Sequence, residues 1–471
     1  MGINWLNEVE MRKDDLIKDT QALLQINSVL NEEEVSPESP FGKGIEEALQ
    51  FLLQKGKADG FVTKNVDHFA GHIEHGQGKD LVGILCHVDV VPEGDGWTDE
   101  PFSATIRDGK IFARGAIDDK GPTMAAYYAL KIVKEMELPL SKRVRIIIGT
   151  DEESGWQCVD HYFKQEEMPT IGFAPDADFP IIHAEKGLGD IQLHLKFEGE
   201  ENQSPAVTLL SFDSGRRLNM VPDHAQATLE ISEGMDEITH AFQSFISENA
   251  VEGEFTEEGS ALTLSIKGVS AHAMEPDNGV NAGYHLATFL NTLPLDLNAA
   301  TYVAFISEKL AFDSRGKKLG IDYHDAVSAD LTVNVGVFHY EKEASIGSIG
   351  VNIRFPVTCD TESVKGKLMQ VTQENSFEVN KFRVVPPHHV PKEHELIQTL
   401  QKVYEEQTGE KADLLAIGGG TYARSLQAGV AFGPLFPGRE DVAHQKDEHI
   451  FIEDLVKATA IYAQAIYELA K

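Results

Sequence analysis

Three short apolar runs in the first 180 residues end in acidic or imidazole side chains, and this repeated pattern constrains the fold more than any other feature. The runs span residues 81–86, 144–149 and 171–174, and they are followed by His87, by Asp151–Glu153 and by Asp176. Short β-branched runs that alternate with helical patterns are typical of strands buried on both faces of an α/β sheet. Ligand sites in such sheets lie at the carboxyl ends of the strands. We therefore expect a mixed central sheet flanked by helices, with these side chains gathered at one edge.

A further acidic cluster, Asp118-Asp119, precedes a predicted helix. Residues 122–136 have a proline near the first turn and apolar residues at helical spacing. Asp118 would lie just ahead of the helix N-terminus, where the helix dipole favours a negative charge.

These residue types together suit a pair of divalent metal ions. Zinc or manganese binds imidazole nitrogen and carboxylate oxygen, and two ions roughly 3.5–4 Å apart need a carboxylate that bridges them. We interpret Asp118 as the bridge. One ion would then be held by His87 and Asp176, and the other by Glu153 and His444.

Two more acidic residues have predicted roles beside the ions. A carboxylate that does not bind metal can take a proton from a metal-activated water, and Glu152, next to Glu153, fits this role of general base. Asp89 lies two residues after His87 and is expected to accept the other ring N–H of His87, which fixes the tautomer. Each pattern alone is more typical of a solvated surface, but five ligand positions at strand or helix ends favour a site.

Five motifs resemble those of the dinuclear metallopeptidases related to aminoacylase and carboxypeptidase G, and in particular the PepV-type bacterial dipeptidases. The motifs occupy residues 87–92, 115–122, 149–154, 174–177 and 443–448. Their order and spacing agree from about residue 10 to the C-terminus. The resemblance implies a cis peptide bond between Asp118 and Asp119.

The resemblance also implies the domain organisation. It predicts a catalytic domain built from residues 1–187 and 385–471, with an inserted α+β lid domain at residues 188–384. The lid is about twice as large as in the dimeric members of the family, and strand-like segments lie before and after about Ala300. We therefore expect a lid of two related halves and an active monomer.

Several lid residues match positions that contact substrate in PepV-type enzymes. The resemblance implies that His272 stabilises the oxyanion and that Arg354 and Asn219 hold the C-terminal carboxylate of the substrate. Without the resemblance, we would interpret His272 as an ordinary lid histidine and Arg354 as a solvated or ion-paired strand residue. The residues expected to line the substrate cleft are Gly419, Gly420 and Thr421.

The predicted activity is hydrolysis of dipeptides with a free amino terminus. It would use two divalent metal ions per chain, for which zinc is the first choice and manganese the alternative. An N-acyl-amino-acid deacylase or a succinyl-diaminopimelate desuccinylase of the same family would share every metal ligand. A peptide-binding protein without catalysis would need no general base, so Glu152 argues against it. A metal-storage protein is disfavoured by the five ordered ligand positions.

Composition indicates a cytoplasmic protein that binds neither nucleic acid nor membrane. The net charge is −35, from 41 basic and 76 acidic residues, whereas phosphate contacts need stripes of Lys and Arg. No apolar run approaches the roughly 18 residues of a membrane span. The N-terminal residues are acidic where a secretory signal would be basic and apolar, and three cysteines are too few for a disulfide framework.

Overall fold

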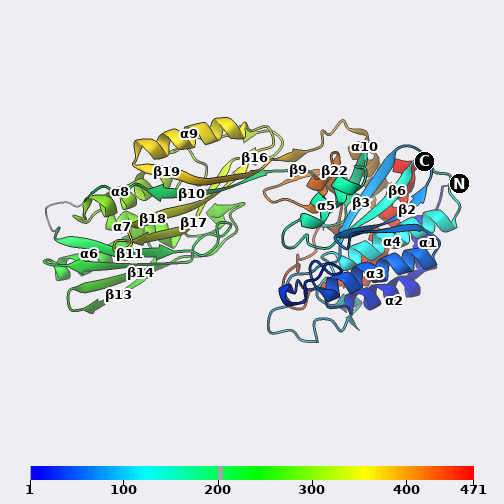
Figure 1. Ribbon diagram of the computed structural model, residues 1–471, viewed down its shortest axis with the longest axis horizontal. Coiled ribbons are helices and arrows are strands. Elements are labelled where there is room, and N and C mark those ends of the chain that lie inside the picture. Colours follow the sequence, from blue (N-terminus) through cyan, green and yellow to red (C-terminus); the bar gives the residue numbers. More distant parts are fainter. Residues whose placement is uncertain (1, 200–204) are drawn as a thin grey trace. The chain divides into compact units, whose positions relative to one another are not determined.

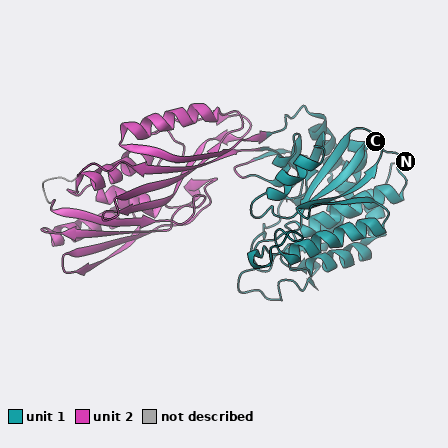
Figure 2. Ribbon diagram, viewed as in Figure 1, with its two compact units in different colours: residues 1–184, 389–416, 420–471 teal, residues 185–388, 417–419 magenta. Residues whose placement is uncertain are grey.

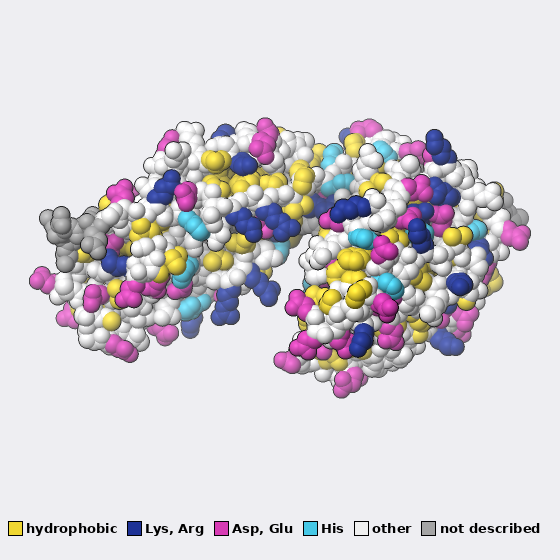
Figure 3. Space-filling model, in the orientation of Figure 1, with side chains coloured by type: hydrophobic (Ala, Val, Ile, Leu, Met, Phe, Trp, Pro, Cys, Tyr) yellow, Lys and Arg dark blue, Asp and Glu magenta, His cyan; other side chains and the backbone are white. Residues whose placement is uncertain are grey.

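The computed structural model describes residues 2–199 and 205–471 and divides the chain into two compact units. Unit 1 comprises Met1–Ala184, His389–Ala416 and Gly420–Lys471, and unit 2 comprises Glu185–His388 and Ile417–Gly419 (Figure 2). Acidic side chains are spread over the visible face of each unit (Figure 3), and the net charge of the chain is −35. Among the described residues, no helix is both long and apolar enough to cross a membrane.

Unit 1 is built on a mixed sheet whose strands run in the order β1-β2-β6-β3-β7-β22-β9-β20, with β21 beside β9. The three apolar runs form β3 (Leu81–His87), β6 (Arg143–Gly149) and β7 (Ile171–Ala174), which pair in parallel and are almost entirely buried. The remaining strands are β1 (Val62–Val66), β2 (Ala70–Gly76), β9 (Ile181–Glu185), β20 (His388–His389), β21 (Leu414–Ile417) and β22 (Gly429–Ala431). The predicted α/β class is therefore confirmed.

Two helices that are far apart in sequence, α4 (Lys120–Glu135) and α11 (Ile452–Ala470), pack together against β3 and β6 (Figure 1). Both are apolar around most of their circumference, and both are buried accordingly. Unit 1 also contains α3 (Lys43–Ala58), α5 (Gln157–Gln165) and α10 (Glu395–Thr408).

The N-terminal segment, for which residues 5–24 predict one helix, forms two helices instead. They are α1 (Trp5–Glu10) and α2 (Lys13–Leu24). Arg12, at the break, has φ −115° and ψ 7°, and its guanidinium donates to the carbonyl oxygen of Glu8 at 2.7 Å. This hydrogen bond satisfies a carbonyl at the end of α1, so the chain can turn there at little cost.

A small sheet of three short strands lies beside the start of α4. It consists of β4 (Thr105–Arg107), β5 (Lys110–Phe112) and β24 (His449–Phe451), in the order β24-β5-β4. The pairing of His449 with Phe112 brings the segment that carries His444 next to the residues that precede α4.

Unit 2 contains one antiparallel sheet of eight strands in the order β13-β14-β12-β11-β17-β18-β10-β19. Its strands are β10 (Gly187–Leu195), β11 (Val207–Ser214), β12 (His224–Ile231), β13 (Glu252–Glu258), β14 (Ala261–Lys267), β17 (Thr332–Glu341), β18 (Ile346–Phe355) and β19 (Phe377–Val385). Its helices are α6 (Met235–Glu248), α7 (Ala282–Leu290), α8 (Leu297–Phe305) and α9 (Thr361–Glu374).

The eight strands form two related halves, as predicted. The first half has the order β11-β12-β14-β13 and includes α6, and the second has the order β17-β18-β10-β19 and includes α9. The halves meet edge to edge, where residues 211–214 pair with residues 338–341. A division at about Ala300 holds for every strand except β10, which precedes the first half in sequence but pairs between β18 and β19.

Candidate metal centre

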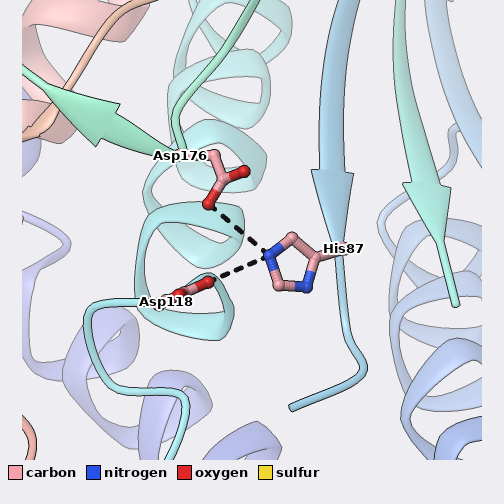
Figure 4. Close-up of side chains that lie close together, drawn as sticks. All are labelled: His87, Asp118 and Asp176. Atoms are coloured by element: carbon pink, nitrogen blue, oxygen red, sulfur yellow. Dashed lines mark hydrogen bonds and ion pairs between the residues drawn. The ribbon is translucent and has the colours of Figure 1, made fainter. Parts of the chain in front are cut away.

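His87 is the last residue of β3 and is completely buried. Its Nε2 lies 3.0 Å from Asp118 Oδ1 and 3.5 Å from Asp176 Oδ1 (Figure 4). Asp176 follows β7, the parallel neighbour of β3, so both strands deliver their side chains to the same edge of the sheet. Asp118 lies in the turn that precedes α4.

A second group forms on the other oxygen of Asp118. His444 Nε2 lies 3.0 Å from Asp118 Oδ2 and 3.0 Å from Glu153 Oε1. Each of the two groups has three ligand atoms within 4.8 Å of one another, and Asp118 belongs to both. The structure therefore brings together the five residues that the sequence analysis assigned as metal ligands, with the carboxylate of Asp118 between the two imidazoles.

The charges of the cluster fit a pair of dications. Asp118, Asp176, Glu153 and the adjacent Glu152 carry four negative charges when ionised, which two divalent ions would balance. Hydrogen bonds to Asp118 and Glu153 raise the pKa of His444 to about 11, so positive charge is strongly favoured at that position. Burial, and then the negative charge of Asp176, raise the pKa of Glu152 well above its usual value. Imidazole nitrogens and carboxylate oxygens are suitable donors for such ions.

The carboxylate of Asp89 has a different partner from the one expected. His87 Nδ1 is 3.0 Å from the main-chain oxygen of Asp89 and 3.5 Å from its carboxylate. The carboxylate instead accepts the backbone N–H groups of Glu152 and Glu153, at 3.2 and 3.0 Å. It is turned toward these two donors because the turn after β6 presents them side by side. Asp89 therefore fixes the main chain of the proposed base and of one ligand.

Three supporting carboxylates lie in motifs noted in the sequence but were assigned no role there. Asp119 accepts the backbone N–H of His87 and the hydroxyl of Thr123, each at 3.1 Å. Asp151 accepts two backbone N–H groups at the start of α5. Glu448 is completely buried beside the turn that precedes α4. Their only sequence signal is proximity to a ligand. The peptide bond between Asp118 and Asp119 is cis, as expected.

The predicted lid residues of unit 2 lie near one another. Asn219 O accepts the N–H of Ala273, the residue after His272. Burial, and then the charge of Arg354, lower the pKa of His272 and favour its neutral form. Arg354 is buried on β18 and donates to Asn352 Oδ1 at 2.8 Å and to the carbonyl oxygen of Gly418 at 3.0 Å.

The glycine run divides between the two units. Gly419 belongs to unit 2, whereas Gly420 and Thr421 belong to unit 1. A Cβ atom on Gly420 would come within 2.7 Å of the guanidinium of Arg424, so the end of that side chain would have to move if Gly420 were replaced. Thr421 Oγ1 accepts the N–H of Ala423 and caps a 3-10 turn at Tyr422–Ser425. Substrate contact by any of these residues remains a prediction.

Comparisons with known proteins identify the family to which the chain belongs. Residues 83–468 match the model of peptidase family M20/M25/M40. The chain is 57% identical to the Bacillus subtilis (strain 168) protein named "Putative dipeptidase YtjP", over 100% of both chains.

Two solved structures have the same fold. Aminoacylhistidine dipeptidase from Vibrio alginolyticus has a TM-score of 0.59 at 15% identity, covering 97% of this chain and 96% of that one. The dinuclear metal-binding peptidase YXEP of Bacillus subtilis has a TM-score of 0.50 at 10% identity, covering 98% and 99%. The resemblance inferred from the motifs is confirmed: the chain belongs to peptidase family M20/M25/M40 and is a metallopeptidase.

Proposed function

We propose that this enzyme hydrolyses the peptide bond of dipeptides with a free amino terminus, with two divalent metal ions held at the five-residue cluster. The observation that carries the proposal is the position of Asp118, which offers one oxygen to the group of His87 and the other to the group of His444. A relative of 57% identity over the whole chain carries the name "Putative dipeptidase YtjP", and YXEP, which has the same fold, is named as a dinuclear metal-binding peptidase.

The ligand set selects the class of metal. His87 and Asp176 would hold one ion, Glu153 and His444 the other, and Asp118 both. Two neutral imidazoles and three carboxylates suit zinc, with manganese as the alternative. When bound, the ions supply Lewis acidity, which acidifies a water molecule and polarises the peptide carbonyl.

Glu152 performs the proton transfers. It lies next to the ligand Glu153, but its carboxylate belongs to neither ligand group. It accepts the proton of the attacking water and then delivers it to the leaving amine. Asp89 keeps the main chain of Glu152 in place through the hydrogen bond to its N–H. His272, Arg354 and Asn219 are proposed to support the oxyanion and the substrate carboxylate.

The test is a comparison of Glu152→Gln with the wild type after both are loaded with Zn²⁺. Loss of a general base typically lowers kcat by roughly 10²- to 10⁴-fold. Zinc content should stay the same, because Glu152 is not a ligand. Glu32→Gln, an exposed glutamate on a short 3-10 turn, is the matched control and should leave kcat unchanged. Full hydrolysis by Glu152→Gln would remove Glu152 from the assigned role.

A substrate panel separates the proposed dipeptidase from its nearest alternatives. A deacylase or desuccinylase of the same family would use the same ligands but would act on N-acylated amino acids. Dipeptides with free amino termini should be hydrolysed far faster than N-acetyl or N-succinyl amino acids. The reverse preference would leave the metal centre intact and overturn the dipeptide assignment. An active monomer in the cytoplasm is part of the same proposal.

A further inference from the structure

Glu448 is a completely buried carboxylate that belongs to neither group of metal ligands. It follows His444 by four residues, on the segment that leads into β24. A buried carboxylate is costly unless its oxygens are fully hydrogen-bonded, so its partners indicate what it is for.

Among the described residues, all of the hydrogen-bond donors to the Glu448 carboxylate lie in one turn, residues 114–118. Oε1 accepts the backbone N–H groups of Ile117 at 2.9 Å and of Asp118 at 3.2 Å. Oε2 accepts the backbone N–H of Gly115 at 2.9 Å and a guanidinium N–H of Arg114 at 2.7 Å. The turn that carries Asp118, the ligand shared by both groups, therefore directs its hydrogen-bond donors at the single side chain of Glu448.

Backbone hydrogen bonds between β24 and the residues at β5 hold Glu448 next to this turn. His449 pairs with Phe112 in the small sheet, and the N–H of Ala113 donates to the main-chain oxygen of Glu448 at 3.1 Å. The neighbouring Asp447 accepts the N–H and the hydroxyl of Thr98 at 2.8 and 2.9 Å. The segment is thus fixed on both sides before any ligand is considered.

We propose that Glu448 is a positioning residue for the metal centre. It holds the main chain of Asp118 so that Oδ1 faces His87 and Oδ2 faces His444. Because Arg114 is also buried and neutralises the charge of Glu448, the pair adds no net charge to the centre, and its effect is on geometry. The segment from His444 to Glu448 therefore supplies one ligand and also fixes the residue shared by both groups.

This inference rests on the proposed metal centre but not on the dipeptide as substrate. Its test is Zn²⁺ affinity, measured on metal-free protein by competition with a chromophoric chelator. Glu448→Gln replaces one oxygen by an amide NH₂, which leaves two of the four donors without an acceptor. Substitution of a residue that supports a metal ligand typically lowers metal affinity by roughly 10- to 100-fold. We expect Glu448→Gln to lower Zn²⁺ affinity by a factor in that range.

Asp325→Asn in unit 2 is the matched control. Asp325 is a buried carboxylate that also accepts several backbone N–H groups, from Val327 at 2.9 Å, Ser328 at 2.6 Å and Thr358 at 3.0 Å. Its substitution should lower the melting temperature without changing Zn²⁺ affinity. If Glu448→Gln binds two zinc ions as tightly as the wild type, or if Asp325→Asn loses the same affinity, the positioning role is overturned.

A second measurement needs no variant and therefore applies even if Glu448→Gln does not fold. In metal-free wild-type protein, the amides of Gly115, Ile117 and Asp118 should already be protected from hydrogen exchange, because Glu448 holds them before metal binds. Protection that appears only after Zn²⁺ is added would overturn the proposal. Failure of the wild type to bind Zn²⁺ at all would instead refute the metal centre itself.

Discussion

The shared position of Asp118 predicts how many metal ions remain when single ligands are removed. Asp118→Ala takes one of three donors from both groups. His87→Ala takes one donor from the first group and leaves the second complete, and His444→Ala does the reverse. The three variants should therefore differ in the number of bound ions, although each lacks a single ligand.

The size of the effect follows from the number of donors. Loss of one ligand of three should weaken a group by at least ~100-fold, the upper end of what a supporting residue contributes, or about 2.8 kcal/mol. At free Zn²⁺ tenfold above the wild-type Kd, an intact group is about 0.9 occupied and a weakened group about 0.1 occupied. The expected contents are about 1.8 ions for the wild type, about 1.0 for His87→Ala and His444→Ala, and about 0.2 for Asp118→Ala.

The assay is equilibrium dialysis of each protein in a zinc buffer, followed by elemental analysis. Asp160→Asn, an exposed acid on α5, is the control and should keep the wild-type content. If Asp118→Ala retained a full ion while His87→Ala lost both, Asp118 would not be shared, and the argument from its two oxygens would be wrong.

Two further predictions concern residues around the site. Burial, and then the charge of Arg145, lower the pKa of His72 from 6.5 to about 4, so protonation favours the unfolded chain. Neutral His72 therefore contributes fully to the free energy of unfolding above pH 6.5. This contribution is lost as the pH falls toward 4, by up to ~3 kcal/mol. Urea unfolding should show a weaker pH dependence for His72→Gln, and identical slopes between pH 7 and 4 would contradict this reasoning. Asp89→Asn should lower kcat by roughly 10- to 100-fold, since a hydrogen bond to a charged group is worth about 1.5–3 kcal/mol. Wild-type kcat in that variant would show that the turn at Glu152 needs no such support.

The positions of the candidate metal ligands could be predicted because they follow strong local signals. His87 and Asp176 come directly after buried runs, and parallel strands end at a common edge. Asp118 precedes a helix whose apolar pattern is plain in the sequence. In each case, the chemistry of one side chain and the strand or helix next to it in the sequence were sufficient to suggest a position.

Other features depend on contacts that no local pattern encodes. Glu448 reaches the turn before α4 through the pairing of two three-residue strands, which are too short to show a period. The direction of the Asp89 carboxylate depends on a turn some 60 residues later. The break between α1 and α2 depends on the side chain of Arg12, because the apolar spacing continues across it.

Unit 1 is assembled from segments before and after unit 2 in the chain. Strand β22 lies between β7 and β9, and α11 packs on α4, so the core cannot close until residues 429–470 have been synthesised. The four-stranded half formed by β11 to β14 needs no later strand for its own pairing. During synthesis, the growing chain therefore lacks both His444 and Glu448 while most of unit 2 is already available to fold. A nascent polypeptide of this sequence therefore lacks part of the candidate metal centre until these late residues have been made.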